Sequence, residues 1–282
     1  QYEQNEIEFL PVDVEEAADQ LMIAKWIMRT LAYQYGINLT FSPKITAGKA
    51  GSGMHVHTKL VKEGRNMYIK DGVLTDDALK VIAGMLDIST SLTAFGNTIP
   101  TSYLRLVPHQ EAPTNICWGD RNRSVLVRVP LGWTSGAKGM IADANPIEKN
   151  ITEIDPGAKQ TVEFRCPDGS ADIYLLLAGL TVAARHGFEM ENGITYGKER
   201  YVSGNIFVDA HKATAEKLSQ LTASCEDSAE CLEKKRKIYE DKNVFSPALI
   251  DGLITKLKEY RDQTLRSGLG DNKEKILELG NK

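Results

Sequence analysis

The sequence lacks an apolar run long enough to cross a bilayer. Its most apolar stretch, residues 173–184, falls well short of the roughly 20 residues that a membrane-spanning helix needs, and it predicts a buried helix instead. No secretory signal is visible in the first residues. Cysteine is scarce: there are four, and no two form a C-x-x-C pair. These absences predict a cytoplasmic protein with reduced thiols.

A large excess of one charge is also missing. The formal net charge is −4, so the composition gives no support for binding to nucleic acid or to a membrane surface. Internal repeats and low-complexity tracts are absent as well, and 282 residues are ample for a buried core. We therefore expect a globular chain without a nucleic-acid or membrane partner. Because the chain opens at Gln1 and not at a methionine, we also expect it to be a fragment of something longer.

What is present is a set of short segments in which apolar and polar residues alternate. Residues 4–9, 54–60, 124–129 and 162–166 each predict a strand with one apolar and one polar face, and residues 38–42 are a further strand-like segment. The polar faces carry carboxylates, imidazoles and guanidinium groups, from Glu6, Glu8, His55, His57, Arg128, Glu163 and Arg165. If these strands share a sheet, we expect one packed side and one side lined with metal ligands and anion-binding groups.

Helical patterns fill most of the remaining chain. Three helices are predicted at residues 13–36, 75–96 and 170–187. Their expected first and last residues include Asp13, Gly36, Thr75, Gly96 and Gly187. From about residue 209 onward the pattern is helical and charged, with breaks at 224–227 and 245–247. The chain therefore combines strands in its first two thirds with a helical C-terminal section.

The stretch "GSGMHVHTKL", residues 51–60, suggests several kinds of site. It has neither the glycine order and following helix of a dinucleotide fingerprint nor the Gly-Lys-Ser/Thr ending of a P-loop. His55 and His57 on one strand face can bind metal, or they can be two half-buried histidines beside a turn. A metallohydrolase would need more ligands than the remaining histidines, His109, His186 and His211, are placed to give.

Three further motifs allow both a structural and a functional interpretation. "RNRSVLVR", residues 121–128, is either a solvated basic edge or, with Arg105 nearby, a clamp for phosphate or carboxylate. "RLVPHQEAP", residues 105–113, places Glu111 in a proline-bounded loop. "VEFRCPDGSADIYL", residues 162–175, puts a glutamate and an arginine on one strand face, which taken singly indicates a structural ion pair.

Taken together and in this order, five segments resemble the catalytic domain of the glutamine synthetase family, in its type I-like form. They are "QNEIEF" (4–9), "FSPKITAGKAGSGMHVH" (41–57), "RLVPHQEAP" (105–113), "RNRSVLVRVP" (121–130) and "VEFRCPDGSADIYLLLAGL" (162–180). The resemblance implies an α+β fold with a curved, antiparallel-rich sheet and helices on one side. It also implies an enzyme that uses ATP and Mg²⁺ or Mn²⁺ to phosphorylate the γ-carboxylate of glutamate, so that ammonia can displace the phosphate.

The resemblance also assigns expected roles, residue by residue. The metal ligands it implies are Glu6, His55 and Glu163. The residues it places along the phosphates of ATP are His57, Arg123 and Arg128. The residues it places on glutamate are Gly51, Arg105 and Arg165. Glu111 would lie on a flap that shields the acyl phosphate and takes a proton from ammonium, and Arg123 would also act in the transfer step.

Two departures from the family pattern affect the expected substrate. Ala50 stands where the family generally has an asparagine that holds glutamate, and Lys59 stands where a serine commonly contacts the nucleotide. The loss of the amide at position 50 therefore leaves the acyl substrate open more than it affects the phosphoryl chemistry. The amine partner can be ammonia, or an alkylamine or polyamine, because the family also includes ligases for those amines. A non-catalytic structural or regulatory relative is the remaining alternative, although none of the expected functional residues above is altered.

The resemblance also concerns what this chain does not include. We divide it into residues 1–205, the core of the catalytic domain without its first strands, and residues 206–282, the helical C-terminal section of the same domain. The resemblance implies that the family's N-terminal β-grasp domain, and the first catalytic strands with their Glu-x-Glu metal pair, lie outside these residues. We therefore expect a homo-oligomeric ring for the full-length protein and no ligase activity from these 282 residues alone.

Overall fold

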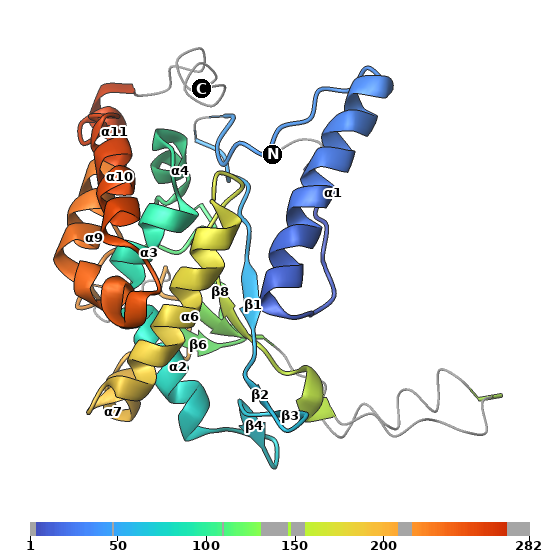
Figure 1. Ribbon diagram of the computed structural model, residues 1–282. Helices are drawn as coiled ribbons and strands as arrows, with labels where there is room; N and C mark the ends of the chain where they lie inside the picture. The colour runs from blue at the N-terminus through green and yellow to red at the C-terminus, as the bar shows by residue number, and fades with distance from the viewer. Residues whose placement is uncertain are drawn as a thin grey trace.

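The computed structural model describes residues 4–46, 48–108, 110–130, 146–147, 156–207 and 216–269 (Figure 1). The helices are α1 (Val14–Gln34), α2 (Asp76–Asp87), α3 (Ser89–Gly96), α4 (Pro100–Arg105), η1 (Pro156–Lys159), α6 (Ile173–Glu189), α7 (Gly193–Glu199), α9 (Cys225–Glu240), η3 (Asp241–Asn243), α10 (Pro247–Lys258) and α11 (Leu265–Leu269). The strands are β1 (Val56–Thr58), β2 (Val61–Lys62), β3 (Arg65–Asn66), β4 (Ile69–Lys70), β5 (Val73–Leu74), β6 (Trp118–Asp120), β7 (Val127–Val129) and β8 (Val162–Phe164). His109 and His211, two of the three remaining histidines weighed as metallohydrolase ligands, lie outside the described residues.

The main sheet has four short strands in the order β1-β8-β7-β6. The pairs β1–β8 and β7–β8 are antiparallel, whereas β6 and β7 run parallel. Three of these strands, β1, β7 and β8, lie inside segments that the alternation pattern predicts. The α+β class and the antiparallel-rich sheet are confirmed, and β6 adds a parallel edge that the sequence pattern does not indicate.

Two predicted strands are wrong. Residues 4–9 and 38–42 have no regular secondary structure, and the side chains of both faces of the first segment are exposed, with Ile7 at 57% and Phe9 at 39%. A strand needs a neighbour to pair its amides and carbonyls. In the described part of the chain, no strand pairs with either segment. Alternation alone therefore does not produce a strand here.

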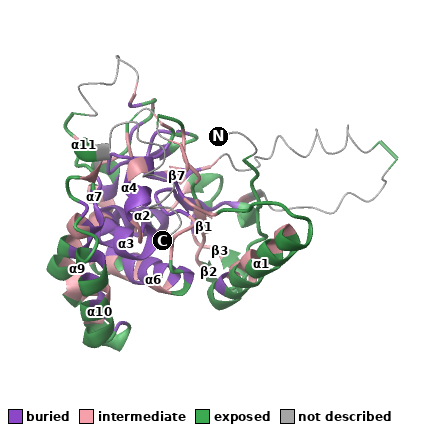
Figure 2. Ribbon diagram, turned by 90° about the horizontal axis from the view of Figure 1, so that it is seen from above, coloured by how far each residue is buried: buried purple, intermediate pink, exposed green. Residues whose placement is uncertain are grey.

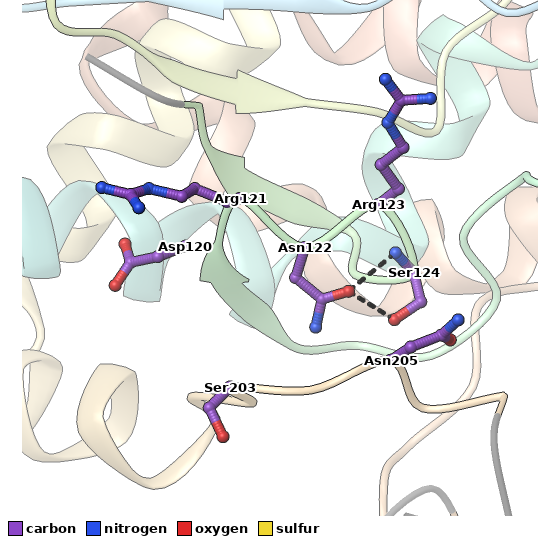
Figure 3. Close-up of a pocket in the computed structure, with 7 residues that line it drawn as sticks. All are labelled: Asp120, Arg121, Asn122, Arg123, Ser124, Ser203 and Asn205. Carbon is purple, nitrogen blue, oxygen red and sulfur yellow. Dashed lines mark hydrogen bonds between the residues drawn. The ribbon is translucent and has the colours of Figure 1, made fainter. Parts of the chain in front are cut away.

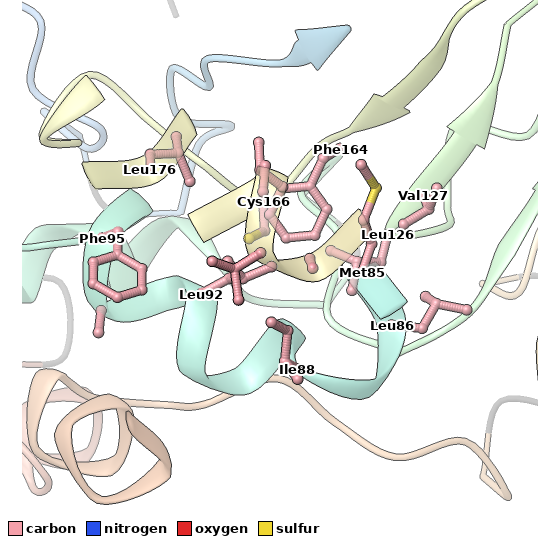
Figure 4. Close-up of a cluster of buried hydrophobic side chains, with 14 of the residues drawn as sticks. Met85, Leu86, Ile88, Leu92, Phe95, Leu126, Val127, Phe164, Cys166 and Leu176 are labelled. Atoms are coloured by element: carbon pink, nitrogen blue, oxygen red, sulfur yellow. The ribbon is translucent and has the colours of Figure 1, made fainter. Parts of the chain in front are cut away.

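Helices cover one face of the sheet and build the core with it. Figures 1 and 2 show α2, α3, α6, α9 and α10 gathered on one side, with α1 standing apart from them. Buried side chains from α2 and α3, such as Met85 and Leu92, meet Val127 and Phe164 from the sheet (Figure 4). Each such side chain contributes about 1.5–3 kcal/mol when fully buried. The predicted helical side of the sheet is thus confirmed.

The helices α2 and α6 approach so closely that side chains do not fit between them. A Cβ atom on Gly84 would lie 1.9 Å from the carbonyl oxygen of Ala183, and one on Gly187 would lie 1.9 Å from the carbonyl oxygen of Lys80. The expectation that Gly187 ends the core helix is wrong, because α6 continues to Glu189. Gly187 instead allows two helix backbones to touch.

The predicted helix over residues 75–96 is confirmed at its N-cap but not as one continuous helix. Thr75 caps α2 by accepting a hydrogen bond from the amide of Ala78. The helix then breaks at Ile88, and α3 continues at 73° to α2. Hydroxyl groups follow the break, and Ser89 donates to the carbonyl of Leu86 at 2.8 Å, a contact that competes with regular helix bonding. Among the described residues no single helix is both long enough and apolar enough to cross a membrane. Only α2 and α3 taken together, as this bent pair, have the required length and apolarity.

The ends of α1 agree with the sequence pattern, whereas α6 begins at Ile173 and not at residue 170, and residues 216–224, predicted as helical, contain no helix. Asp13 precedes α1, and Gly36, with a φ of +66°, follows it, as expected for a helix ended by glycine. The two predicted breaks in the C-terminal section are helix N-caps: Ser224 caps α9 and Ser246 caps α10. Both helices contribute to the same apolar core as α2 and α6.

Candidate active site

Three side chains form a row across the sheet face that is opposite the helices. His57 on β1 is in register with Glu163 on β8, and Glu163 is in register with Arg128 on β7. Directly opposed residues on neighbouring strands present their side chains on the same face. The polar face predicted from alternation is therefore confirmed for β1, β7 and β8. We call His55, His57, Arg128, Glu163 and Arg165 the polar cluster.

Glu163 is the fully buried centre of the polar cluster. Its Oε1 lies 3.0 Å from Nδ1 of His55 and 3.4 Å from Nε of Arg165, and its Oε2 accepts a hydrogen bond from Nε of Arg128. Burial by itself raises the pKa of a carboxyl group, but the His55 imidazole and the Arg128 guanidinium outweigh it and lower the pKa of Glu163 to about 2. The residue is therefore an anion at neutral pH.

His55 and Glu163 lie close enough to share a cation. The Oε1 atom of Glu163 is buried and makes no hydrogen bond of good geometry, although Nδ1 of His55 is 3.0 Å away. An imidazole nitrogen and a carboxylate oxygen suit Mn²⁺, and the oxygen suits Mg²⁺. Within the described ranges no group of three or more histidine, cysteine, aspartate or glutamate residues is arranged to hold a metal. The pair thus supplies two donor atoms of the kind that a cation site needs, and its expected role as a metal site stays a prediction.

His57 lies next to the cation pair and is held by a hydroxyl group. Its Nδ1 is 3.0 Å from Oγ1 of Thr161. Burial lowers the pKa of His57, and the nearby Glu163 carboxylate only partly offsets this effect. The ring is therefore neutral at physiological pH and is suited to hydrogen bonding.

Arg105 and Arg165, expected on glutamate, are both buried and bound to main-chain carbonyls. Arg105 is 3% exposed, and its Nη1 donates to the carbonyl of Cys166 at 2.7 Å. Arg165 is 4% exposed and donates to the carbonyls of Arg123 and Val125. These bonds join the β7 and β8 region to the end of α4. Their expected role in holding glutamate stays a prediction.

The residues 48–53, here called the glycine loop, pack directly on Arg105. A Cβ atom on Gly51 would lie 2.3 Å from the carbonyl oxygen of Pro43, and one on Gly53 would lie 2.3 Å from Nη2 of Arg105. Both glycines are therefore needed because the backbone has no room for a side chain. The loop leads straight into β1 and the polar cluster.

Glu6 lies on an exposed segment, and Glu111 is an exposed residue between the partly buried Gln110 and the buried Ala112. Near Glu6, the side chain of Gln4 donates to Oγ of Ser52 at 3.0 Å, which brings the N-terminal segment against the glycine loop. Glu111 follows α4 and has a φ of +63°, which is unusual for a residue other than glycine. Such backbone strain is typical of functional positions. Neither residue forms a metal group with His55 and Glu163 here.

The arginines of residues 121–128 do not converge as one clamp. Arg128 is bound to Glu163, whereas Arg121 and Arg123 are exposed and point in different directions (Figure 3). The latter two border a cavity of about 430 Å³. It is lined by Asp120, Arg121, Asn122, Arg123, Ser124, Ser203 and Asn205.

Sequence reasoning does not identify Lys44 as part of this region. The residue lies in the turn-rich stretch before the glycine loop, where a lysine is normally solvated, yet it is 2% exposed. Its Nζ binds the side chain of Gln110, beside Glu111. No sequence pattern indicates this contact, because the two residues are 66 positions apart.

Comparison with known proteins places these features in one family. Residues 1–268 match the family described as "Glutamine synthetase, catalytic domain". The glutamine synthetase of Pyrococcus abyssi is 34% identical over 240 residues, which are 84% of this chain and 48% of that protein. The chain thus spans about half the length of the curated relatives it matches.

Solved structures share the fold. A glutamine synthetase of Plasmodium falciparum superposes with a TM-score of 0.68 at 19% identity, over 90% of this chain and 52% of that one. A structure described as a GmaS/ADP complex gives a TM-score of 0.68 at 23% identity, over 92% of this chain and 55% of that one. The chain belongs to the glutamine synthetase family.

Proposed function

We propose that this chain carries the catalytic sheet of an ATP-dependent carboxylate–amine ligase, which joins glutamate and ammonia through γ-glutamyl phosphate. The observation that carries the proposal is the polar cluster, in which a buried anion, Glu163, is surrounded by two arginines and an imidazole. Phosphoryl transfer needs positioned cations more than covalent chemistry. A cluster of this kind, beside a loop in which Gly51 and Gly53 leave no room for a side chain, suits a small anionic substrate and a nucleotide.

The residues of the cluster would hold a divalent cation. His55 and Glu163 would bind Mg²⁺ or Mn²⁺ on the nucleotide side, and Glu6 would serve a second cation nearer to glutamate. The support is the Glu163 Oε1 atom, which is buried without a hydrogen bond. When bound, the cations supply charge that neutralises the phosphates. His57, which is neutral, would accept or donate one hydrogen bond along the phosphates.

The arginines and the glycine loop would orient the reactants. Arg123 and Arg128 would stabilise the transferring phosphoryl group. Arg105 and Arg165 would bind the carboxylates of glutamate next to the glycine loop, and the backbone of Gly51 would lie close to the substrate. The tight contact of Gly51 and Gly53 with neighbouring atoms supports a close approach between main chain and ligand.

Glu111 would act beside the acyl phosphate, which water would otherwise hydrolyse. Its carboxylate would take a proton from ammonium and leave an uncharged amine that can attack the acyl phosphate. The positive φ and the exposed side chain of Glu111 support a functional role for this position.

The choice of amine is the finer part of the proposal. Ammonia is the first choice, and an alkylamine or a polyamine is the alternative, as in other ligases of the family. Ala50 and Lys59 depart from the family pattern at positions expected near glutamate and nucleotide, so they leave the acyl substrate open as well. One structural neighbour is a complex with ADP, and its similarity to this chain supports a nucleotide site of the same kind. We also infer that the full-length protein forms a homo-oligomer in the cytoplasm, and that these 282 residues alone are inactive.

The test is phosphate release by the full-length protein with ATP, Mg²⁺ and glutamate, comparing ammonium, alkylamines and polyamines as acceptors. We expect release that depends on one of these amines and that Glu163→Gln abolishes. Glu230→Gln, an exposed change on α9, is the matched control and should leave the rate unchanged. Absence of release with every amine would instead favour a non-catalytic relative.

A further inference from the structure

Lys44 is a buried lysine between α1 and the glycine loop. Lysine is almost never fully buried unless it is paired, yet this side chain is 2% exposed. Burial, followed by the charge of the nearby Arg105, lowers the pKa of Lys44 to about 8. Placing a cation here is unfavourable, so its contacts must compensate.

The Lys44 ammonium joins two loops that are far apart in the sequence. Its Nζ donates to the carbonyl oxygen of Lys49 in the glycine loop, and to Oε1 of Gln110 at 2.5 Å. Gln110 immediately precedes Glu111. A single side chain therefore connects the glycine loop to the loop that carries Glu111.

Main-chain contacts hold the segment around Lys44 against the glycine loop. The amide of Ser52 donates to the carbonyl of Pro43 at 2.9 Å, and the missing side chain of Gly51 lets the loop lie against Arg105. On the other side, Glu111 is exposed and has a left-handed backbone conformation. The contact thus runs from the buried Lys44 to a loop whose exposed residue is Glu111.

We propose that Lys44 is a positioning residue that, through Gln110, holds Glu111 beside the glycine loop. The inference rests on the proposed role of Glu111 and extends it by naming the residue that sets the position of its loop. A methionine at position 44 keeps the apolar stem and loses the donors. A hydrogen bond from a charged donor is stronger than one from a neutral donor. Loss of the bond from Lys44 to Gln110 should therefore increase the population in which the loop with Glu111 is detached at least about tenfold.

The first test needs no enzymatic activity. In the full-length protein, cleavage by a glutamate-specific protease after Glu111 should be at least about tenfold faster in Lys44→Met and in Gln110→Leu. The double variant should be no faster than either single variant, because both changes remove the same contact. Lys62→Met, on the exposed β2, is the matched control. Cleavage at glutamates of α9 reports general unfolding and should not change.

The second test separates positioning from a purely structural role. Lys44→Met should raise the amount of phosphate released per amide formed, with the KM for ATP unchanged, since water then reaches the acyl phosphate. If Lys44→Met does not fold, Gln110→Leu carries both tests, because Gln110 is partly exposed.

The outcomes are distinguishable from failure of the proposed function. Equal cleavage after Glu111 in all variants would overturn the Lys44 contact as a determinant of the loop position. Faster cleavage with an unchanged ratio of phosphate to amide would make Lys44 structural only. If the wild-type protein releases no phosphate at all, the proposed function fails, while the cleavage rates still decide whether Lys44 holds the loop.

Discussion

Nε of Arg128 donates a hydrogen bond to the Glu163 carboxylate across the β7–β8 pair, and the two residues are also direct neighbours in the strand register. Sheet pairing and ion pairing therefore fix the same contact. Since Glu163 also lies beside His55 and Arg165, it supplies negative charge to three neighbours at once.

Replacing Glu163 by glutamine should therefore destabilise the protein by about 3 kcal/mol at neutral pH, because it leaves buried cations without a counter-charge. Unfolding in urea, followed by tryptophan fluorescence, measures this loss. A loss within about 0.5 kcal/mol, the range of ordinary surface substitutions, would contradict the importance of the buried carboxylate.

The same variant has a defined pH dependence. The folded-state pKa of Glu163 is about 2, below its ordinary 4.5, so its ionised form contributes stability that is fully present above about pH 4.5 and is lost as the pH falls through 2. The stability difference between wild type and Glu163→Gln should thus shrink over this window. Asp87, whose pKa is also lowered to about 2, is present in both proteins and cancels.

The cation pair makes a prediction about metal affinity. His55→Ala should weaken Mn²⁺ binding to the full-length protein at least tenfold, because even the outer partners of metal ligands contribute 10–100-fold. Titration followed by Mn²⁺ electron paramagnetic resonance measures the affinity. His186→Gln is the control, since His186 binds Asp87 at 2.9 Å and not Glu163. Equal affinities in the three proteins would remove His55 from the site.

Gly187 provides a test of the packing between α2 and α6. Gly187→Ala should destabilise the protein by about 1–3 kcal/mol, because its Cβ atom would overlap the carbonyl of Lys80. Gly252→Ala, in the middle of α10, has no atom within 4 Å of the new Cβ and should instead add about 0.5–1 kcal/mol. Thermal unfolding of the two variants should therefore shift in opposite directions.

The polar cluster could be predicted from sequence because its information is local. Alternation places His57, Arg128 and Glu163 on polar strand faces, and pairing of those strands then brings the side chains together. The helix caps at Thr75, Ser224 and Ser246 are also local signals, since one side chain satisfies nearby amides.

Other features depend on partners distant in the sequence. Residues 4–9 alternate like a strand, but no strand pairs with them within the described segments. Gly187 has the pattern of a helix stop, yet a glycine is needed there because the backbone of α2 leaves no room for a side chain. Lys44 lies in a stretch rich in turn residues, and only the folded chain brings its ammonium group into contact with Gln110. Local patterns cannot report such contacts.

Glu111 combines backbone strain with its proposed role as a base. A left-handed conformation costs a residue other than glycine about 1–2 kcal/mol, whereas glycine loses about 0.5–1 kcal/mol of unfolded-state entropy. Glu111→Gly should therefore leave the stability unchanged or raise it by up to about 1.5 kcal/mol. Amide formation by the full-length protein should fall by about 10²–10⁴.

A matched control separates these two effects. Glu63, at the turn between β2 and β3, has a φ of 51° and is also exposed. Glu63→Gly should show the same change in stability and keep the full rate of amide formation. Measuring unfolding and amide formation for both variants therefore separates the effect of relieving the backbone strain from the effect of removing the Glu111 carboxylate. Equal activity of the two variants would show that the strained carboxylate is not needed, because both changes relieve the same backbone conformation and only one removes the proposed base.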